Sequence, residues 1–205
     1  MKVMVVTGGI GSGKSLVCRI LNESYGYPVF EADAKVKELY ASKPVLLDAI
    51  EAAICMTVRD ADGKFSPRML AAAIFTDREA LEKVETVVFP ALKEDFAAFA
   101  ALHSDKEYVV FESATVLEKR QFDGFGDVTV LVDAPFEVRL ERAVARDGMP
   151  REKVLERMTN QRLMNELSEG GKDSRIDYVI VNDGMAAEVG KKVAEMLEKL
   201  SKQKC

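Results

Sequence analysis

The sequence predicts an α/β fold: an open parallel sheet of five strands with helices on both faces, in three layers. Five short segments of mostly β-branched apolar residues recur along the 205-residue chain, and the stretches between them show apolar residues at helical spacing. The strand segments are apolar along their whole length, which is typical of parallel strands covered on both faces. Strands that alternate with helices in this way predict an open parallel sheet.

The first expected strand is closed by glycines and leads at once into a helix over residues 14–24. In that helix, apolar residues recur at Leu16, Val17, Ile20 and Leu21. Two further helices, 136–146 and 186–202, follow the last two strands. The expected strands span residues 3–6, 28–30, 108–111, 128–132 and 178–181.

A long detour separates the second expected strand from the third. Residues 42–105 are too many for one crossover helix, and they carry helical patterns over 68–75, 78–88 and 90–102. We therefore expect a helical subdomain beside the sheet. No internal repeat or Pro/Ser-rich linker divides the chain, so the parts should form a single domain.

Composition narrows the possible functions. Apolar residues make up 48% of the chain and charged residues 31%, and 29 Lys and Arg against 34 Asp and Glu give a net charge of −5. This balance disfavours general binding to nucleic acid or to anionic membranes. The chain has no 18-residue apolar run and no signal-peptide pattern, so we expect a cytoplasmic protein. The odd number of cysteines (Cys18, Cys55 and Cys205) and the single histidine, His103, favour reduced thiols over a metal site.

The strongest chemical signal is the glycine-rich segment Gly8–Ser15, which fits the P-loop pattern G-x-x-x-x-G-K-[ST] between a strand and a helix. In such a loop, backbone N–H groups and a helix N-terminus surround the phosphates of a nucleotide. Lys14 would reach the β- and γ-phosphates, and the Ser15 hydroxyl would bind Mg²⁺. The dinucleotide pattern G-x-G-x-x-G fails, because Lys14 stands where its third glycine belongs. The loop therefore predicts a nucleoside triphosphate as ligand.

A P-loop alone does not separate kinases from switch GTPases and motor ATPases. The chain contains no N-K-x-D sequence for reading guanine, and its D-x-x-G sequences at 60–63 and 123–126 are better explained as turns. The acidic residue that motor ATPases place directly after a buried strand has only a faint counterpart in Glu112. A kinase is favoured, while a nucleotide-dependent switch or assembly ATPase stays as an alternative.

Two carboxylates, Glu31 and Asp33, follow the second expected strand, at the edge of the sheet where open α/β proteins bind ligands. In extended chain they would share a face. One could then accept a proton from a hydroxyl nucleophile while the other helps to hold Mg²⁺. Asp33 could equally be the N-cap of a helix over 34–41.

Arginines recur after the fourth expected strand. Arg139, Arg142 and Arg146 stand at i, i+3 and i+7 of the expected helix, and residues 139–175 hold nine Lys and Arg against seven Asp and Glu. Such an excess suits a lid that closes over the phosphates, stabilising their charge and excluding water. The alternative is a solvated helix face with i,i+4 ion pairs. We assign Arg142 and Arg146 to the site, and the later Arg151, Arg157 and Arg162 to the lid surface.

Taken together, these segments resemble the dephospho-coenzyme A kinase family, P-loop kinases of the nucleoside-monophosphate-kinase type, over nearly the whole chain. The form Thr-Gly-Gly-Ile-Gly-Ser-Gly-Lys-Ser of the loop is more specific than the bare P-loop pattern. The matching residues are Thr7–Ser15, Ala32-Asp33, Asp62-Gly63, Ile74-Phe75, Val132–Ala134, the three arginines of 139–146, Gln161, 177–180 and 182–184.

The resemblance implies ATP-dependent phosphorylation of the ribose 3′-hydroxyl group of dephospho-CoA, the last step of coenzyme A synthesis. It implies a single P-loop kinase domain, with a core of residues 1–41, 106–146 and 176–205, an acceptor-binding helical insertion of about 42–105 and a lid of about 147–175. The catalytic residues would be Asp33 as general base, Lys14, Arg142 and Arg146, with Mg²⁺ on Ser15. ATP would bind at Gly9, Gly11, Ser12, Gly13, Lys14, Ser15, Leu16 and Asn182.

This chain departs from the family pattern where the acceptor is expected to bind. The family usually has Asp-Ala-Asp in place of 31–33 and Asp-Arg in place of Ser66-Pro67. It also has His-Pro in place of Phe89-Pro90 and Pro-Leu-Leu-Phe-Glu in place of 114–118. Another small-molecule kinase on the same architecture is therefore the first rival interpretation.

Overall fold

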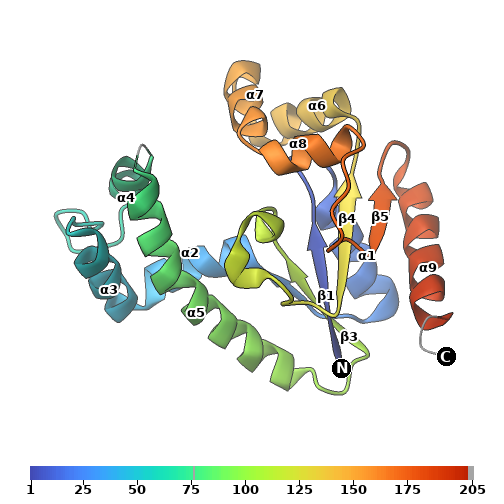
Figure 1. Cartoon of the computed structure of the whole chain (residues 1–205), viewed down its shortest axis with the longest axis horizontal. Helices are drawn as coiled ribbons and strands as arrows, with labels where there is room; N and C mark the ends of the chain where they lie inside the picture. The colour runs from blue at the N-terminus through green and yellow to red at the C-terminus, as the bar shows by residue number, and fades with distance from the viewer. Residues whose placement is uncertain (76, 203–205) are drawn as a thin grey trace. The chain divides into compact units, whose positions relative to one another are not determined.

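The computed structural model describes residues 1–75 and 77–202 and confirms the predicted α/β class. Its sheet has five parallel strands in the order β2-β3-β1-β4-β5 (Figure 1). Met4 of the central strand pairs with Val110 on one side and Val128 on the other. The strands are β1 (Lys2–Thr7), β2 (Val29–Glu31), β3 (Tyr108–Glu112), β4 (Val128–Asp133) and β5 (Tyr178–Val181).

The chain divides into two compact units. The first comprises Met1–Phe30 together with the chain from His103 onward, and it contains nearly all of the sheet. Its helices are α1 (Lys14–Tyr25), the short 3₁₀ turns η1 (Val116–Glu118) and η2 (Arg120–Phe122), α6 (Phe136–Asp147), α7 (Arg151–Thr159), α8 (Arg162–Ser168) and α9 (Ala186–Lys202).

The main core of this first unit fills the space between the sheet and the helices α1 and α9. Both helices are amphipathic and bury one apolar stripe, as their spacing predicts. Elsewhere in the unit, four aromatic rings (Phe30, Phe111, Phe122 and Phe125) form a stacked and edge-on cluster. The buried residues of the main core include Met4, Val6, Val17, Leu21, Val130, Val193 and Met196.

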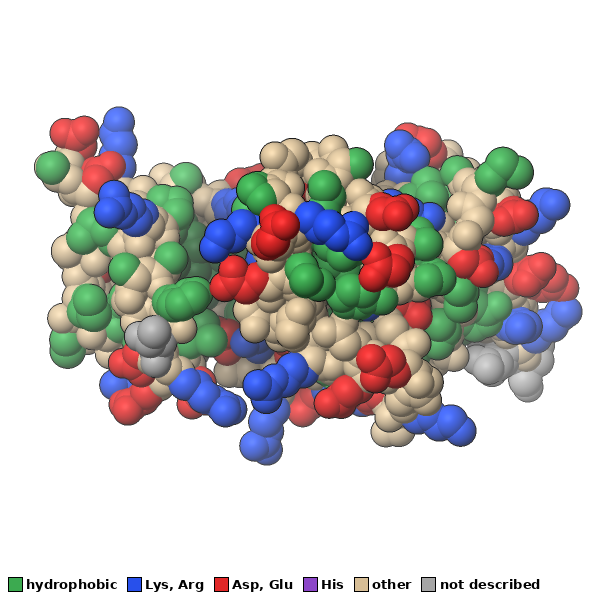
Figure 2. All heavy atoms as spheres, turned by 90° about the horizontal axis from the view of Figure 1, so that it is seen from above, with side chains coloured by type: hydrophobic (Ala, Val, Ile, Leu, Met, Phe, Trp, Pro, Cys, Tyr) green, Lys and Arg blue, Asp and Glu red, His purple; other side chains and the backbone are tan. Residues whose placement is uncertain are grey.

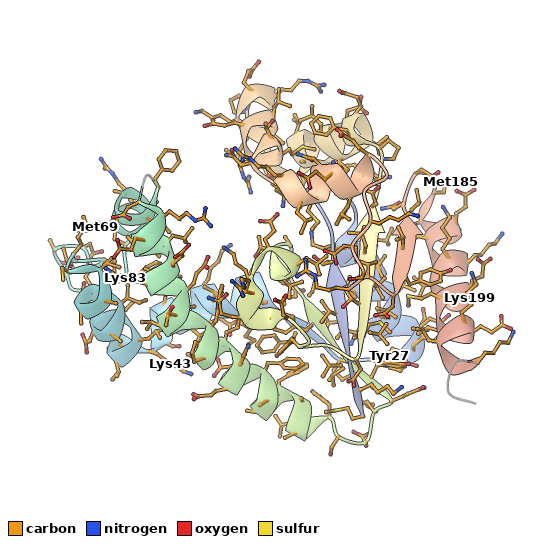
Figure 3. The ribbon with its side chains drawn as sticks, in the orientation of Figure 1. Tyr27, Lys43, Met69, Lys83, Met185 and Lys199 are labelled. Carbon is orange, nitrogen blue, oxygen red and sulfur yellow. The ribbon has the colours of Figure 1, made fainter. Side chains whose placement is uncertain are left out.

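Strand β5 differs from the prediction that every strand is covered on both faces. Only Ile180 is fully buried in it, whereas Val179 is 48% exposed and Val181 is 41% exposed. The reason is its place at the edge of the sheet, where α9 covers one face. Lys199 of α9 lies 5.2 Å from the centre of the Tyr178 ring, and Met185 stands exposed at the turn before that helix (Figure 3).

The second unit, Glu31–Leu102, is helical. Helices α3 and α4 pack beside α5, and a turn with an isolated bridge between Arg59 and Phe65 joins α3 to α4 (Figure 1). Ser66 caps α4, because its hydroxyl accepts a hydrogen bond from the Met69 N–H. The helices are α2 (Ala32–Ser42), α3 (Pro44–Ile54), α4 (Pro67–Ile74) and α5 (Arg78–Leu102).

Helix α5 corrects the expectation of two helices over 78–88 and 90–102. It runs unbroken through Pro90, which lies inside it. Proline removes one backbone donor but does not end this helix, because a regular series of buried residues continues on both sides. That series is Ala80, Val84, Val88, Leu92, Phe96 and Ala100.

On the face seen in Figure 2, basic and acidic side chains are interspersed and form no continuous basic area. Across the described part of the chain, no helix combines the length and the apolar character needed to cross a membrane.

Candidate active site

The glycine-rich loop connects β1 to α1, as the sequence predicts. Gly13 is the N-cap of α1 and has a φ of 99°, in the left-handed region that favours glycine. It offers no capping side chain, so the first N–H groups of α1 are left for a ligand. The N–H groups of Leu16 and Val17 already donate to the Gly13 carbonyl. The loop therefore has the geometry of an anion site at a helix N-terminus.

Lys14 is folded back onto its own loop. Its ammonium donates to the carbonyl oxygens of Gly8, at 2.9 Å, and Gly9, at 3.4 Å, and it lies 3.8 Å from the Glu112 carboxylate. The side chains of Lys14 and Glu112 are each 12% exposed. Ser15, next to Lys14, is exposed. The structure thus brings a cation and a carboxylate together at the end of the loop, and Ser15 is the next residue of the helix.

This donor set fits a Mg²⁺ ion that is held largely by phosphate oxygens. Magnesium in such sites takes one or two protein oxygens and completes its shell with phosphate and water. Ser15 and Glu112 are oxygen donors of the required kind. Within residues 1–75 and 77–202, no group of three or more His, Cys, Asp and Glu side chains could hold a metal by itself.

Asn182, which follows β5, ties the loop to helix α6. Its side-chain amide donates to the Ser12 carbonyl at 2.9 Å, and its backbone oxygen accepts a hydrogen bond from Arg142 at 3.0 Å. A Cβ atom on Gly13 would overlap the Asn182 amide nitrogen, so glycine is also needed there for close approach. Asn182 is 3% exposed, and its side chain supports the loop from within.

The three arginines of α6 have different surroundings. Arg142 is partly buried and bonded to Asn182. Arg146 is exposed and bonded to Asp147 at 2.7 Å, which raises the pKa of Arg146 and lowers the pKa of Asp147. Arg139 is 1% exposed, and burial lowers its pKa while Asp133 opposes the shift.

Sequence reasoning did not identify Arg139 or Gln161 as neighbours of the loop. Gln161, between α7 and α8, accepts a hydrogen bond from the Ile10 N–H at 2.7 Å. Ile10 also packs against the apolar cluster that α6 and α7 share. For Arg139 a signal was present, because it stands four residues before the buried Ala143 on the same stripe of α6.

Asp33 lies in the second unit, in the first turn of α2, and its side chain is exposed. The N-cap of this helix is Glu31, which makes no capping hydrogen bond through its side chain. The interpretation of Asp33 as the N-cap is therefore wrong. The expectation that Glu31 and Asp33 share a face of extended chain is also wrong, because the helix begins between them at Ala32.

The segments that depart from the family pattern lie within helices and strands of the structure or directly beside them. Ser66 caps α4 and Pro67 begins it, while Phe89 and Pro90 lie within α5. Residues 114–118 connect β3 to η1. Phe75, just after α4, is 81% exposed, which is unusual for a large aromatic side chain.

A five-stranded parallel sheet in this order, with the glycine-rich loop after its central strand, defines the protein as a nucleotide-binding protein of the P-loop class. The family model "Dephospho-CoA kinase" matches residues 2–188. The chain belongs to the dephospho-CoA kinase family and is an enzyme, a kinase that uses a nucleotide. Membership carries with it the reaction for which the family is named, the phosphorylation of dephospho-CoA.

Individual relatives agree with the family match. The dephospho-CoA kinase of Novosphingobium aromaticivorans is 38% identical over 198 residues, which cover 95% of this chain and 92% of that protein. A crystal structure from Thermus thermophilus has a TM-score of 0.76 and 31% identity, with 97% of each chain covered. The Campylobacter jejuni dephospho-CoA kinase shares the fold at a TM-score of 0.63 and 20% identity, covering 99% of this chain and 98% of its own.

Proposed function

We propose that this kinase transfers the γ-phosphoryl group of ATP to the ribose 3′-hydroxyl group of dephospho-CoA, which gives coenzyme A and ADP. The observation that carries this proposal is the loop Thr7–Ser15 between β1 and α1, in a chain of this family. The oxygen of the 3′-hydroxyl forms a bond to the γ-phosphorus while the bond from that phosphorus to the β,γ-bridging oxygen breaks. The hydroxyl proton leaves to a base.

The loop residues bind and orient the triphosphate. The amides of Gly9, Gly11 and Gly13 and of the first residues of α1 line the phosphates. Ser12 and Leu16 lie in the same loop and first turn, where their N–H groups donate to the Gly9 and Gly13 carbonyls and hold the shape of the site. Lys14 exchanges its present contacts with the Gly8 and Gly9 carbonyls for phosphate oxygens. Because the transition state of phosphoryl transfer is loose and rich in charge, positioning and charge stabilisation provide most of the catalysis.

Mg²⁺ would be held by the Ser15 hydroxyl, with Glu112 in reach of the same end of the loop. When bound, the ion neutralises charge on the phosphate oxygens. Asn182 supports the Ser12 carbonyl beneath the phosphates and holds Arg142. Arg142 and Arg146 contact phosphate oxygens from the side of α6, after Arg146 exchanges its bond with Asp147 for a phosphate.

Asp33 accepts or orients the proton of the 3′-hydroxyl group. It is exposed, and no capping contact engages it, so its carboxylate is available to an acceptor. The helical insertion, about residues 42–105, binds the rest of the acceptor, and residues 147–175 act as the lid. The core, the insertion and the lid together form a single P-loop kinase domain.

The direct test is product analysis by mass spectrometry. The purified protein is incubated with Mg-ATP and an equimolar panel of dephospho-CoA, nucleoside monophosphates, shikimate and pantothenate. We expect the mass of one phosphate to be added to dephospho-CoA alone. Phosphorylation of a different panel member would support the rival small-molecule kinase. ATP turnover with no phosphorylated acceptor would support the switch or assembly ATPase.

A further inference from the structure

Arg139 carries a charge that the surrounding protein does not neutralise. Its side chain is 1% exposed, and it is among the largest fully buried side chains of the described chain. One guanidinium nitrogen, Nη2, donates to Oδ1 of Asn165 at 3.2 Å. The guanidinium also lies 5.5 Å from the centre of the Phe136 ring. Across residues 1–75 and 77–202, its Nε and Nη1 have no hydrogen-bond partner.

The acidic group whose charge acts on Arg139 does not neutralise it through a direct contact. Asp133 attracts the Arg139 charge, but its Oδ1 accepts a hydrogen bond from the Ser168 hydroxyl at 2.5 Å, and no hydrogen bond or ion pair joins it to Arg139. A buried cation with unpaired N–H groups is destabilising, and buried charges are ordinarily paired. Such a group is expected where a ligand supplies the missing charge.

The unpaired side of the guanidinium faces the phosphate-binding loop. A Cβ atom built on Gly9 would overlap Nη1 of Arg139, and a Cβ on Gly11 would overlap the Arg139 backbone. Gln161, which holds the Ile10 N–H, lies beside the same point. Gly9 has no positive φ, so close approach of Arg139 accounts for the glycine there.

We propose that Arg139 is a positioning residue of the phosphate site, whose buried charge stabilises the triphosphate across the Gly9–Gly11 arm of the loop. This inference rests on the proposed function, since it requires ATP in that loop. Because the Arg139 side chain is buried, its positive charge acts at reduced screening. Its contribution grows with the number of phosphate charges held by the loop, which a purely structural role would not produce.

The test is the affinity for ATP, ADP and AMP, measured by calorimetry with wild-type protein, Arg139→Gln and Arg139→Lys. We expect Arg139→Gln to weaken ATP binding about tenfold or more, to weaken ADP binding less, and to leave AMP within about twofold. Arg139→Lys keeps the charge and should recover most of the ATP affinity. An equal loss for all three nucleotides, or no loss for ATP, would overturn the proposal.

Lys202→Gln is the matched control. Lys202 stands on α9, outside the lid and the phosphate site, is exposed, and pairs with Glu198 at 2.6 Å, so its loss changes the net charge by the same amount at the surface. We expect its ATP affinity to stay within about twofold of wild type, because an exposed charge is screened. A loss equal to that of Arg139→Gln would assign the effect to net charge and contradict a role for burial.

Gly9→Ala provides a second route if Arg139→Gln does not fold. The added methyl group displaces the guanidinium without removing it, so ATP affinity should fall in the wild-type background. It should change little in the Arg139→Gln or Arg139→Lys background, where the shorter side chain leaves room. Equal losses in all backgrounds would contradict the coupling between Gly9 and Arg139.

The wild-type protein separates the two proposals. Wild-type protein that neither binds ATP nor phosphorylates dephospho-CoA would overturn the proposed function, whereas normal wild-type activity with unaltered variants would overturn only the role of Arg139.

Discussion

Two arginines, one in each compact unit, differ in how far the surrounding residues neutralise their charge. Arg59, in the helical unit, is 19% exposed and bonded through both of its Nη atoms: Nη2 donates to the Pro44 carbonyl at 2.9 Å and to Asp48 at 2.6 Å, and Nη1 pairs with Glu51. Arg139, in the unit with the phosphate-binding loop, is more deeply buried and has one acceptor.

The difference separates a structural charge from one that is arranged for a ligand. Arg59 joins Pro44, Asp48 and Glu51 of α3 to the turn that follows the helix, and the two carboxylates compensate its charge within the unit. The unit with the loop leaves further polar atoms unpaired, namely the hydroxyl oxygens of Thr7 and Ser12, which are buried among the described residues without a hydrogen-bond partner. Unpaired groups thus gather around the loop, where nucleotide binding is proposed.

The largest effect should come from removing the loop cation. We expect Lys14→Ala to lower turnover by about a thousandfold, because phosphate charge in the transition state loses its closest stabilising group. The melting temperature should change little, since the hydrogen bonds from Lys14 to the Gly8 and Gly9 carbonyls lie within its own loop. Steady-state kinetics and thermal unfolding measure the two effects, and Lys199→Ala on α9 is the control. A near wild-type rate would contradict the phosphate role.

Asp33 is the residue of the helical unit that we expect to affect turnover, because it acts on the acceptor. For Asp33→Asn we expect a loss of turnover of about 10²- to 10⁴-fold, with ATP affinity retained. Glu38→Gln is the control on the same helix: Glu38 is exposed, and its ion pair with Lys35, at 2.6 Å, is a surface contact. If Asp33→Asn lost thermal stability and kept its turnover, the catalytic assignment would be wrong.

For Arg59→Gln we expect a smaller effect, which falls on thermal stability and not on ATP affinity. The change removes charge-assisted bonds to Asp48 and Glu51 and should lower the melting temperature by about 2–4 °C. Affinity for ATP should not change, which thermal unfolding and calorimetry test together. A weakened ATP affinity at an unchanged melting temperature would contradict the distinction between Arg59 as a structural charge and Arg139 as a charge arranged for a ligand.

The smallest effect is a dependence of stability on pH. The Val58 N–H, the Thr57 hydroxyl and Arg59 hold the pKa of Glu51 below its ordinary value of 4.5. Because the folded-state pKa is depressed, this contribution is present above the ordinary pKa and is lost as the pH falls through the folded-state value. Wild type should therefore melt above Glu51→Gln at pH 6, and the gap should close in acid. A constant gap from pH 6 to pH 3 would rule out this contribution.

Most of the fold could be predicted because its signals are local. All five strands and the helices 14–24, 136–146 and 186–202 show an uninterrupted apolar run or a helical apolar spacing. The errors came where tertiary context overrides a local rule. Pro90 does not end α5, because a continuous buried stripe holds the helix together, and β5 is half exposed because it is the last strand of the sheet.

For the candidate site, the sequence predicted the loop but not its supports. Lys14 and Ser15 are identifiable because the P-loop pattern is contiguous. Gln161 and Asn182 lie about 150 and 170 residues from the loop segments that they bond, so no local pattern could pair them. Arg139 was grouped with Arg142 and Arg146 by spacing alone, although the three side chains face different surroundings.

The central claim is tested most directly by the stoichiometry and position of the transferred phosphate. Wild-type protein is incubated with Mg-ATP and dephospho-CoA, ADP is quantified, and the product is examined by ³¹P and ¹H nuclear magnetic resonance. We predict one phosphorylated acceptor for each ADP, with the new phosphate on the ribose 3′-oxygen. ADP formed without a phosphorylated acceptor, or a phosphate on another hydroxyl group, would contradict the assignment.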